Sequence, residues 1–534
     1  MTATTFETLV GISNPFDTTD ASAWAIALGG VLFILYYALQ HKFGTSKSMQ
    51  RAPPIIPGGA FSIFPKFFSH DGPFYLMRLS RRVAKVFELP IAPPGSRFIV
   101  VCCPHLGREI LDDPQATKWK TGYSFFDMVC GGDNLFSAEG HRYKHARKST
   151  ATAFARPHLP RMNTIVHRLV NEWTDEMIQN DGKPSKTDTF VVDVSEEMQK
   201  VTIRTICEVG FEHQLCDRDM LKALRSLQIA YREFAQRTPQ NPFRQMAGFL
   251  FAEVREARRA GKVLQDLCQA MLDDYRLKHQ KTSRGSKSDD DDDDDDEHDN
   301  GTGSPEVVHT VLRTIVYDDS YKNDGERVRD MVTYLAGGYD TASYTISWTL
   351  LMLAKQPQTQ RWLREELRKL PPAERPFGCQ ALKWVIRESM RLHPVVAMGV
   401  IRNTSRDMVY DPNRGGRNGI NGGSVGASSI VIPKRSIALI PFLAIHRDGE
   451  IFENPDEFIP RRWESPTADM SKAWLAFGSG RRNCPGQALA NIELCVMLAK
   501  LCSDYEWTIE DEGHVEYYVT LKTVDTTLKA KKIV

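Results

Sequence analysis

The sequence predicts a mainly helical protein with a small β-rich lobe and a single transmembrane helix near its N-terminus. From Met162 to Lys278 the apolar residues recur three and four positions apart, which is the periodicity of helices that bury one face. Residues 85–101 instead alternate apolar and turn residues and predict a small β-sheet. The 534 residues are 42% hydrophobic and 25% charged, an ordinary globular balance, and the net charge of +1 argues against nucleic-acid binding.

The N-terminal segment predicts a membrane anchor. Residues 21–40 carry no charge, and as a helix they would reach roughly 30 Å, about the thickness of the hydrocarbon core of a bilayer. Acidic residues precede this run and basic residues follow it, so residues 1–20 are expected in the lumen and the rest of the chain on the cytoplasmic side. A cleaved signal peptide would need a basic start and a shorter apolar core. The proline-rich residues 41–59 predict a stiff hinge before a domain that covers residues 60–534.

Two segments of this domain predict solvated inserts. Residues 283–304 contain eight consecutive aspartates, and such a charge block repels itself, stays disordered and lacks the spaced ligands of a calcium loop. Residues 413–429 are rich in glycine and serine, and Ser424 lies there in a formal G-x-S-x-G pattern, the nucleophile elbow of hydrolases. That elbow has to begin a helix, whereas Ser429–Ile432 predicts a strand, so the hydrolase interpretation is weak.

One cysteine lies in a sequence suited to a metal-bound thiolate, Phe477-Gly-Ser-Gly-Arg-Arg-Asn-Cys484-Pro-Gly486. The glycines permit a tight turn close to a flat group, and the two arginines bring fixed positive charge near the sulfur. Pro485 suits the first position of a helix over Gln487–Lys500, whose N-terminus is expected to lower the pKa of Cys484. The ten cysteines of the chain form no C-x-x-C pair, which favours reduced thiols over a zinc site or a disulfide framework.

Residues Thr333–Trp348 predict a long apolar helix with a weak point in its middle. Gly337, Gly338 and a run of hydroxyl residues favour local opening of the helical hydrogen bonds. An opened turn at Asp340 and Thr341 would form a wet notch in an apolar wall, with a carboxylate to relay protons and a hydroxyl to hold a water. A glycine pair that packs in a core helix is the alternative interpretation.

Taken in order, these motifs resemble those of the cytochrome P450 family over roughly residues 50–534. The cysteine loop is similar to the family's haem-ligand loop, F-x-x-G-x-R-x-C-x-G, and is complete. Residues 337–341 resemble its oxygen-activation motif. Glu388 and Arg391, with Arg462 downstream, resemble its buried salt network, although the same spacing at Glu365/Arg368 is explained by a solvated helix face.

The resemblance implies the mostly helical P450 fold and a haem b cofactor. Its iron would take Cys484 as axial ligand, beside Phe477, and Asp340 and Thr341 would deliver protons. The expected donors to the haem propionates are Arg147, Tyr143, His446, Arg482 and Arg402. Tyr143 is a departure, because it stands where the family has tryptophan.

The function implied is that of a haem-thiolate monooxygenase. It would transfer one oxygen atom from dioxygen to a lipophilic substrate of the sterol, fatty acid or terpenoid class, with electrons from NADPH through a membrane-bound flavoprotein reductase. The chain would be a single-pass protein of the endoplasmic reticulum, with its catalytic domain facing the cytoplasm. Candidate wall residues are Phe125, Phe126, Met128, Val129, Leu335 and the stretch Val395–Met398. The alternatives are a haem-thiolate isomerase or lyase that needs no dioxygen, haem binding without turnover, and a serine hydrolase at Ser424.

Overall fold

The structure is a computed structural model, and it describes residues 52–57, 60–93, 95–180, 189–240, 243–285, 309–411 and 429–533. The predicted anchor (residues 21–40), the aspartate run and Ser424 lie outside these residues. Within the described ranges, no helix is both long enough and apolar enough to cross a membrane.

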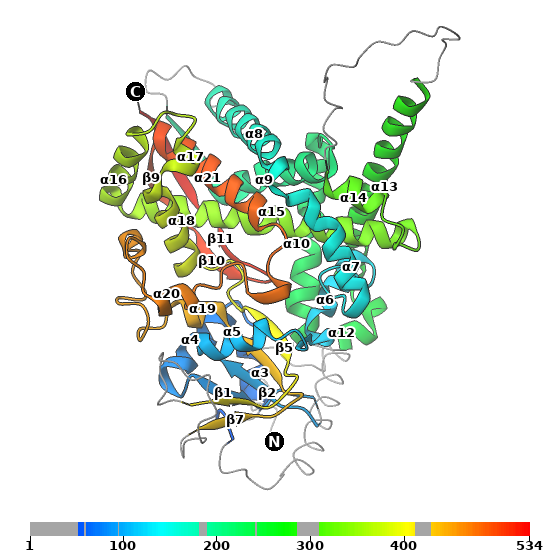
Figure 1. Cartoon of the computed structure of the whole chain (residues 1–534), viewed down its shortest axis with the longest axis vertical. Coiled ribbons are helices and arrows are strands. Elements are labelled where there is room, and N and C mark those ends of the chain that lie inside the picture. Colours follow the sequence, from blue (N-terminus) through cyan, green and yellow to red (C-terminus); the bar gives the residue numbers. More distant parts are fainter. Residues whose placement is uncertain are drawn as a thin grey trace, which may run out of the picture.

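Helices make up most of the described chain, as predicted, and α15 runs through their midst (Figure 1). The longer helices are α3 (Ala60–Phe67), α4 (Gly72–Arg82), α5 (Pro104–Asp112), α6 (Lys120–Cys130), α7 (Gly140–Ala151), α8 (Leu159–Asn180), α9 (Val194–Phe211), α10 (Asp217–Tyr231), α13 (Ala252–Gly285), α15 (Asp324–Lys355), α16 (Pro357–Arg368), α18 (Gln380–Leu392) and α21 (Gln487–Asp504). The shorter ones are α11 (Thr238–Gln240), α12 (Phe243–Met246), α14 (Val311–Val316), α17 (Arg375–Gly378), α19 (Phe442–His446) and α20 (Ala468–Ala473). The 3₁₀ turns are η1 (Thr152–Phe154), η2 (Arg156–His158), η4 (Gly248–Leu250), η6 (Pro460–Trp463) and η7 (Gly480–Arg482), and η3 (Arg232–Arg237) is a π-helix.

The β-rich lobe gathers at the lower end of Figure 1, away from α8, α9 and α13. Its main sheet has the order β1-β2-β8-β5-β3, with β1 (Val86–Leu89), β2 (Phe98–Val101), β8 (Ile437–Ile440), β5 (Val400–Asn403) and β3 (Thr117–Lys118). Strands β1 and β2 pair antiparallel, which confirms the sheet predicted over residues 85–101. The smaller sheets are β4 (Thr189–Asp193) with β12 (Thr527–Lys532) and β9 (Tyr505–Asp511), β10 (His514–Tyr517) with β11 (Leu521–Val524), and β6 (Met408–Tyr410) with β7 (Ile430–Ile432). Because β7 follows the glycine-rich insert, a strand and not a helix comes after the Ser424 pattern.

Helix α15 forms the centre of the helical part and packs along α9. It begins where the Asn323 side chain accepts a hydrogen bond from the amide of Glu326 (3.1 Å). Most of its residues are buried, and they lie on every side of the helix. The opening predicted in its middle is not observed, because the helix is continuous through both glycines. The Thr341 hydroxyl instead donates to the Gly337 carbonyl (3.0 Å), so its hydrogen bond is made within the helix.

A buried salt network joins α18 to the segment that precedes the cysteine loop. Arg391 donates two hydrogen bonds to the Glu388 carboxylate (2.9 Å each), and both side chains are fully buried. Arg462 donates to the same carboxylate (2.9 Å), which confirms the predicted three-residue network. The remaining Arg391 hydrogen bonds reach three backbone carbonyls, those of His446, Pro455 and Glu457. The network therefore fixes α18 against the chain that leads to Cys484.

Candidate haem site

The loop from Phe477 to Gly486 folds as a tight turn that presents Cys484. Gly478 and Gly480 have φ angles of 71° and 69°, which side chains rarely adopt, and a Cβ at Gly480 would lie 2.4 Å from a backbone carbonyl oxygen. The Cys484 amide donates to the Phe477 carbonyl (2.9 Å) and closes the turn. Helix α21 starts at Gln487, so Pro485 lies just before the helix and not at its first position.

The environment of the Cys484 sulfur differs from the one predicted. Burial raises the pKa of Cys484, while the Gly486 amide and the Arg147 guanidinium act in the opposite direction. The prediction of a lowered pKa is therefore wrong for the protein alone, because loss of water around the sulfur outweighs the helix end. Coordination to a metal ion deprotonates a thiol outright, so the same buried sulfur remains suited to a metal.

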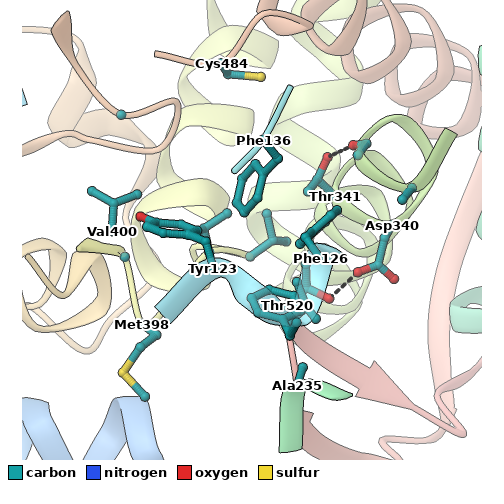
Figure 2. A pocket seen from close by; sticks show the side chains of 18 of the residues that line it. Tyr123, Phe126, Phe136, Ala235, Asp340, Thr341, Met398, Val400, Cys484 and Thr520 are labelled. Carbon is teal, nitrogen blue, oxygen red and sulfur yellow. Dashed lines mark hydrogen bonds between the residues drawn. The ribbon is translucent and has the colours of Figure 1, made fainter. Parts of the chain in front are cut away.

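A cavity of about 620 Å³ separates the cysteine loop from α15, a volume typical of small-molecule sites. Figure 2 shows Cys484 on one side of this space and Thr341 and Asp340 of α15 on another. Most of the wall is aromatic or aliphatic. The predicted wall residues that line it are Phe125, Phe126, Met128, Val395, Val396 and Met398. Val129, Leu335 and Ala397 are instead buried in the core.

Two glycines leave room for a flat group in this cavity. A Cβ added at Gly337 on α15, or at Gly486 at the end of the cysteine loop, would meet no atom within 4 Å, and both glycines line the cavity. Gly338 differs, because a Cβ there would lie 2.6 Å from the Ile206 side chain of α9. One glycine of the pair therefore faces the cavity and the other allows close helix packing, so both interpretations of the pair hold in part.

Cations gather at one edge of the cavity. Burial lowers the pKa of Lys118 well below its ordinary value, and the nearby Arg402 and Arg482 lower it further. Glu139 pairs with Arg482, and its charge acts in the opposite direction on the pKa of Lys118. Arg482 and Arg147 line the cavity and stay charged at any working pH, so this edge suits an anionic group such as a haem propionate. The residues present therefore fit a haem group on both its apolar faces and its charged edge.

The predicted propionate donors take different positions. Arg147, Tyr143 and Arg482 line the cavity together with Phe477. Arg147 donates to the Asn483 side chain (2.8 Å), and the Arg482 guanidinium lies 3.4 Å from the centre of the Tyr143 ring. These contacts dock α7 on the cysteine loop.

Arg402 and His446 lie behind the wall and do not line the cavity. Arg402 is buried on β5 and donates to the Tyr123 hydroxyl (3.3 Å). His446 is fully buried on α19, where its Nε2 accepts a hydrogen bond from the Leu475 amide (2.8 Å). The structure thus places His446 at the entry to the cysteine loop and not at the cavity wall with Arg147, Tyr143 and Arg482.

His446 makes stability depend on pH. Burial lowers the pKa of His446 to about 3, so the folded protein keeps this ring neutral where the unfolded chain, with a pKa of about 6.5, binds a proton. The stabilisation is complete above pH 6.5 and is lost as the pH falls, by about 1.4 kcal/mol per pH unit from this group. We expect His446→Gln to flatten the fall in unfolding free energy between pH 6.5 and 5, measured by urea denaturation. The exposed His141, changed to Gln, is the control, and an unchanged slope in His446→Gln would contradict the assignment.

A thiol that a glycine loop presents to an apolar cavity, opposite a helix that carries an acid and a hydroxyl, is the arrangement expected of a haem-thiolate oxidoreductase. The family model described as Cytochrome P450 matches residues 57–532 of this chain. The chain therefore belongs to the cytochrome P450 family, and its enzyme class is that of the monooxygenases.

Several curated relatives share this similarity. Cytochrome P450 4d8 of Drosophila melanogaster is 33% identical over 190 residues, which are 34% of this chain and 38% of that protein. Cytokinin hydroxylase of Arabidopsis thaliana is 25% identical over 388 residues, 71% of this chain and 67% of that protein. Cytochrome P450 4F2 of Homo sapiens is 22% identical over 433 residues, 78% of this chain and 76% of that protein. The matched segment thus spans well under two thirds of the Drosophila relative and about two thirds or more of the other two.

Proposed function

We propose that the protein transfers one oxygen atom from dioxygen to a lipophilic substrate, such as a sterol, a fatty acid or a terpenoid. The observation that carries the proposal is the apolar cavity with Cys484 on one side and the Asp340–Thr341 turn of α15 on another. When bound, haem would supply the redox centre at which dioxygen is reduced, with one atom transferred to a C–H or C=C bond and the other released in water.

Different residues around the cavity would hold different parts of the cofactor. Cys484 would hold the iron through its sulfur, with Phe477 packed at the start of its loop. Lys118, Arg147 and Arg482 would neutralise the propionates, with Tyr143 stacked on Arg482 and Arg402 adding charge from behind the wall. His446 would position the loop through Leu475 and would not contact the propionates. Lys118 was not predicted from the sequence, because a lone lysine carries no motif.

Proton delivery would fall to α15. Reduction of dioxygen to water consumes protons, and the apolar wall excludes bulk solvent from the cavity. The Asp340 carboxylate and the Thr341 hydroxyl are adjacent polar groups on the α15 side of that wall. A positioned acid or base of this kind contributes about 10²- to 10⁴-fold to a proton-transfer step.

The electron donor proposed is an NADPH-dependent flavoprotein reductase with an acidic face. Lys144 and Lys148 on α7 and Arg481 in the cysteine loop are exposed and lie close to the proposed haem edge. Complementary charge at such a surface accelerates association. Arg142, on the same helix, donates two hydrogen bonds to the buried Asp330 (3.0 Å each), so its charge is already paired.

Membrane attachment at the endoplasmic reticulum is proposed from two features. The first is the uncharged run at residues 21–40. The second is an apolar surface at α12 and η4, where Met246 is 82% and Phe249 is 68% exposed to solvent. Large apolar side chains that face water in this way mark surfaces that contact a partner or a bilayer. The catalytic domain would then lie against the cytoplasmic face of the membrane.

The substrate class is tested by binding and turnover of a homologous series of n-alkyl alcohols. Each methylene buried in an apolar wall stabilises a complex by about 0.8 kcal/mol, so the dissociation constant should fall about fourfold per carbon until the cavity is filled. Binding is followed by isothermal titration of the purified holoprotein. Turnover is followed with purified reductase, NADPH and ¹⁸O-labelled dioxygen.

The expected result is a product with one labelled oxygen atom and an affinity that rises with chain length. An affinity independent of chain length would contradict the lipophilic substrate. A product formed without NADPH and without the label would instead identify a haem-thiolate isomerase or lyase.

A further inference from the structure

The C-terminal hairpin of the chain reaches the same turn of α15 that carries the proposed proton donors. Strands β10 and β11 form this hairpin, and the turn between them, residues 518–520, lines the cavity. Thr520 is the last residue of this turn, and Lys522 lies two residues further on, in β11. Both of these side chains contact Asp340.

The two hairpin residues hold the two oxygens of the Asp340 carboxylate differently. The Thr520 hydroxyl donates a hydrogen bond of 2.5 Å to Oδ2, which Figure 2 shows as a dashed line. The Lys522 ammonium lies 3.6 Å from Oδ1, close enough for an ion pair but too far for a hydrogen bond. Oδ1 is buried and makes no hydrogen bond within the described parts of the chain.

The pair is deeply buried, since the Lys522 and Asp340 side chains are only 5% and 2% exposed. A buried carboxylate without a counter-ion would be strongly destabilised and would take up a proton. Lys522 lies within ion-pair distance and supplies that counter-ion. Thr520 alone would leave the negative charge without compensation.

Aromatic rings surround the ammonium on its other sides. Lys522 Nζ lies 5.1 Å from the centre of the Tyr344 ring, 5.6 Å from that of Tyr518 and 5.9 Å from that of Tyr231. Burial, and then the charge of Asp340, raises the pKa values of Tyr231 and Tyr344 well above their ordinary value, so both phenols are neutral. Neutral rings stabilise a cation through their π faces without supplying a competing anion.

Two further ionisable groups flank the pair. Glu516 lies opposite Lys522 across the hairpin and pairs with His514 at 3.5 Å. Tyr339, beside Asp340 on α15, is a buried phenol whose pKa is raised by burial and then by the charge of Asp340. Asp340 is thus the ion-pair partner of Lys522 on α15.

We propose that Lys522 is the positioning residue of Asp340. It holds the carboxylate toward the hairpin as its counter-ion, and Asp340 passes protons into the cavity from that anchored position. The proposal rests on the monooxygenase function proposed above. Because residues 518–520 line the same cavity, a substrate that fills the cavity contacts the hairpin that holds Asp340.

The test combines stability and turnover. Lys522→Met removes the charge at similar volume, Lys522→Arg retains it, and the exposed Lys529 of β12, changed to Met, is the matched control. In a double-mutant cycle on substrate-free holoprotein, Lys522→Met and Asp340→Asn are expected to be strongly non-additive in urea denaturation, because each removes the same ion pair.

In turnover, the amount of oxygenated product per NADPH consumed should fall about tenfold in Lys522→Met, as expected for a misplaced catalytic group.

The yield per NADPH does not depend on how much enzyme is folded, so a purely structural role for Lys522 would leave it unchanged. Recovery of the yield in Lys522→Arg, with Lys529→Met equal to wild type, would support the proposal. Additive stability losses, or a wild-type yield in Lys522→Met, would overturn it. If the wild-type holoprotein oxygenated no substrate, the proposed function would fail, whereas non-additivity in the cycle would still identify Lys522 as the counter-ion that orients Asp340.

Discussion

Replacing Glu388 by glutamine is expected to lower the unfolding free energy by about 3–5 kcal/mol, because it leaves two buried arginines without their carboxylate. Glu388 accepts hydrogen bonds from Arg391, from Arg462 and from the Trp463 indole N–H (2.9 Å). Folded domains are stable by only about 5–15 kcal/mol, so this loss is a large part of the total. The measurement is urea denaturation of the holoprotein, followed by tryptophan fluorescence.

The network also reaches the cysteine loop, so haem retention should fall with stability. Arg391 donates to the carbonyl of His446, and the His446 ring accepts the amide of Leu475, two residues before Phe477. The control is Glu365→Gln on α16, which has the same E-x-x-R spacing on an exposed face and should change stability by less than about 0.5 kcal/mol. Equal effects of the two substitutions would show that burial of the Glu388 network contributes nothing.

Replacing Cys484 by serine is expected to reduce product formation more than about 100-fold, the upper end of the losses seen when residues that only support metal ligands are changed. A serine hydroxyl keeps the size of the side chain but does not supply a thiolate to the iron. The exposed Cys216, changed to serine, is the control, and it should leave activity at the wild-type level. Product formation is measured with reductase and NADPH at equal protein concentrations. Activity near wild type in Cys484→Ser would exclude this cysteine as the ligand.

The features that were predicted correctly from the sequence depend on local contacts or on a motif that specifies many neighbouring residues. The alternating residues 85–101 form β1 and β2. The spacing of Glu388 and Arg391 was informative only with its apolar context, because burial is what separates this pair from Glu365 and Arg368. The motif of the cysteine loop specifies several residues around one sulfur. Its glycines permit the tight turn that the structure shows.

The features missed depend on contacts between distant parts of the chain. Strand β4 lies within the stretch predicted as mostly helical, and its partner β12 is at the end of the chain. Thr520 lies 180 residues from Asp340, and nothing in the local pattern of the hairpin marks either Thr520 or Lys522 as a partner of an acid. The cationic role of Lys118 likewise appears only once β3 brings it beside Arg402.

Two predictions failed because they considered one effect at a time. The Gly486 amide and Arg147, rather than the predicted Arg481 and Arg482, act to lower the pKa of Cys484, but the effect of burial is larger and raises it. The hydroxyl residues of α15 were expected to open the helix, whereas the Thr341 hydroxyl bonds to the carbonyl one turn earlier and leaves the helix continuous. Burial cannot be read from local sequence, and in both cases the surrounding fold decides the outcome.

The central claim is that Cys484 binds a haem iron as a thiolate. The measurement that tests it most directly is the carbon monoxide difference spectrum of the dithionite-reduced full-length protein, recorded beside Cys484→Ser. The account predicts the strongly red-shifted Soret band that a thiolate ligand gives, present in the wild-type protein and absent from the variant. A folded wild-type protein that carries no haem, or the same red-shifted band in Cys484→Ser, would contradict it.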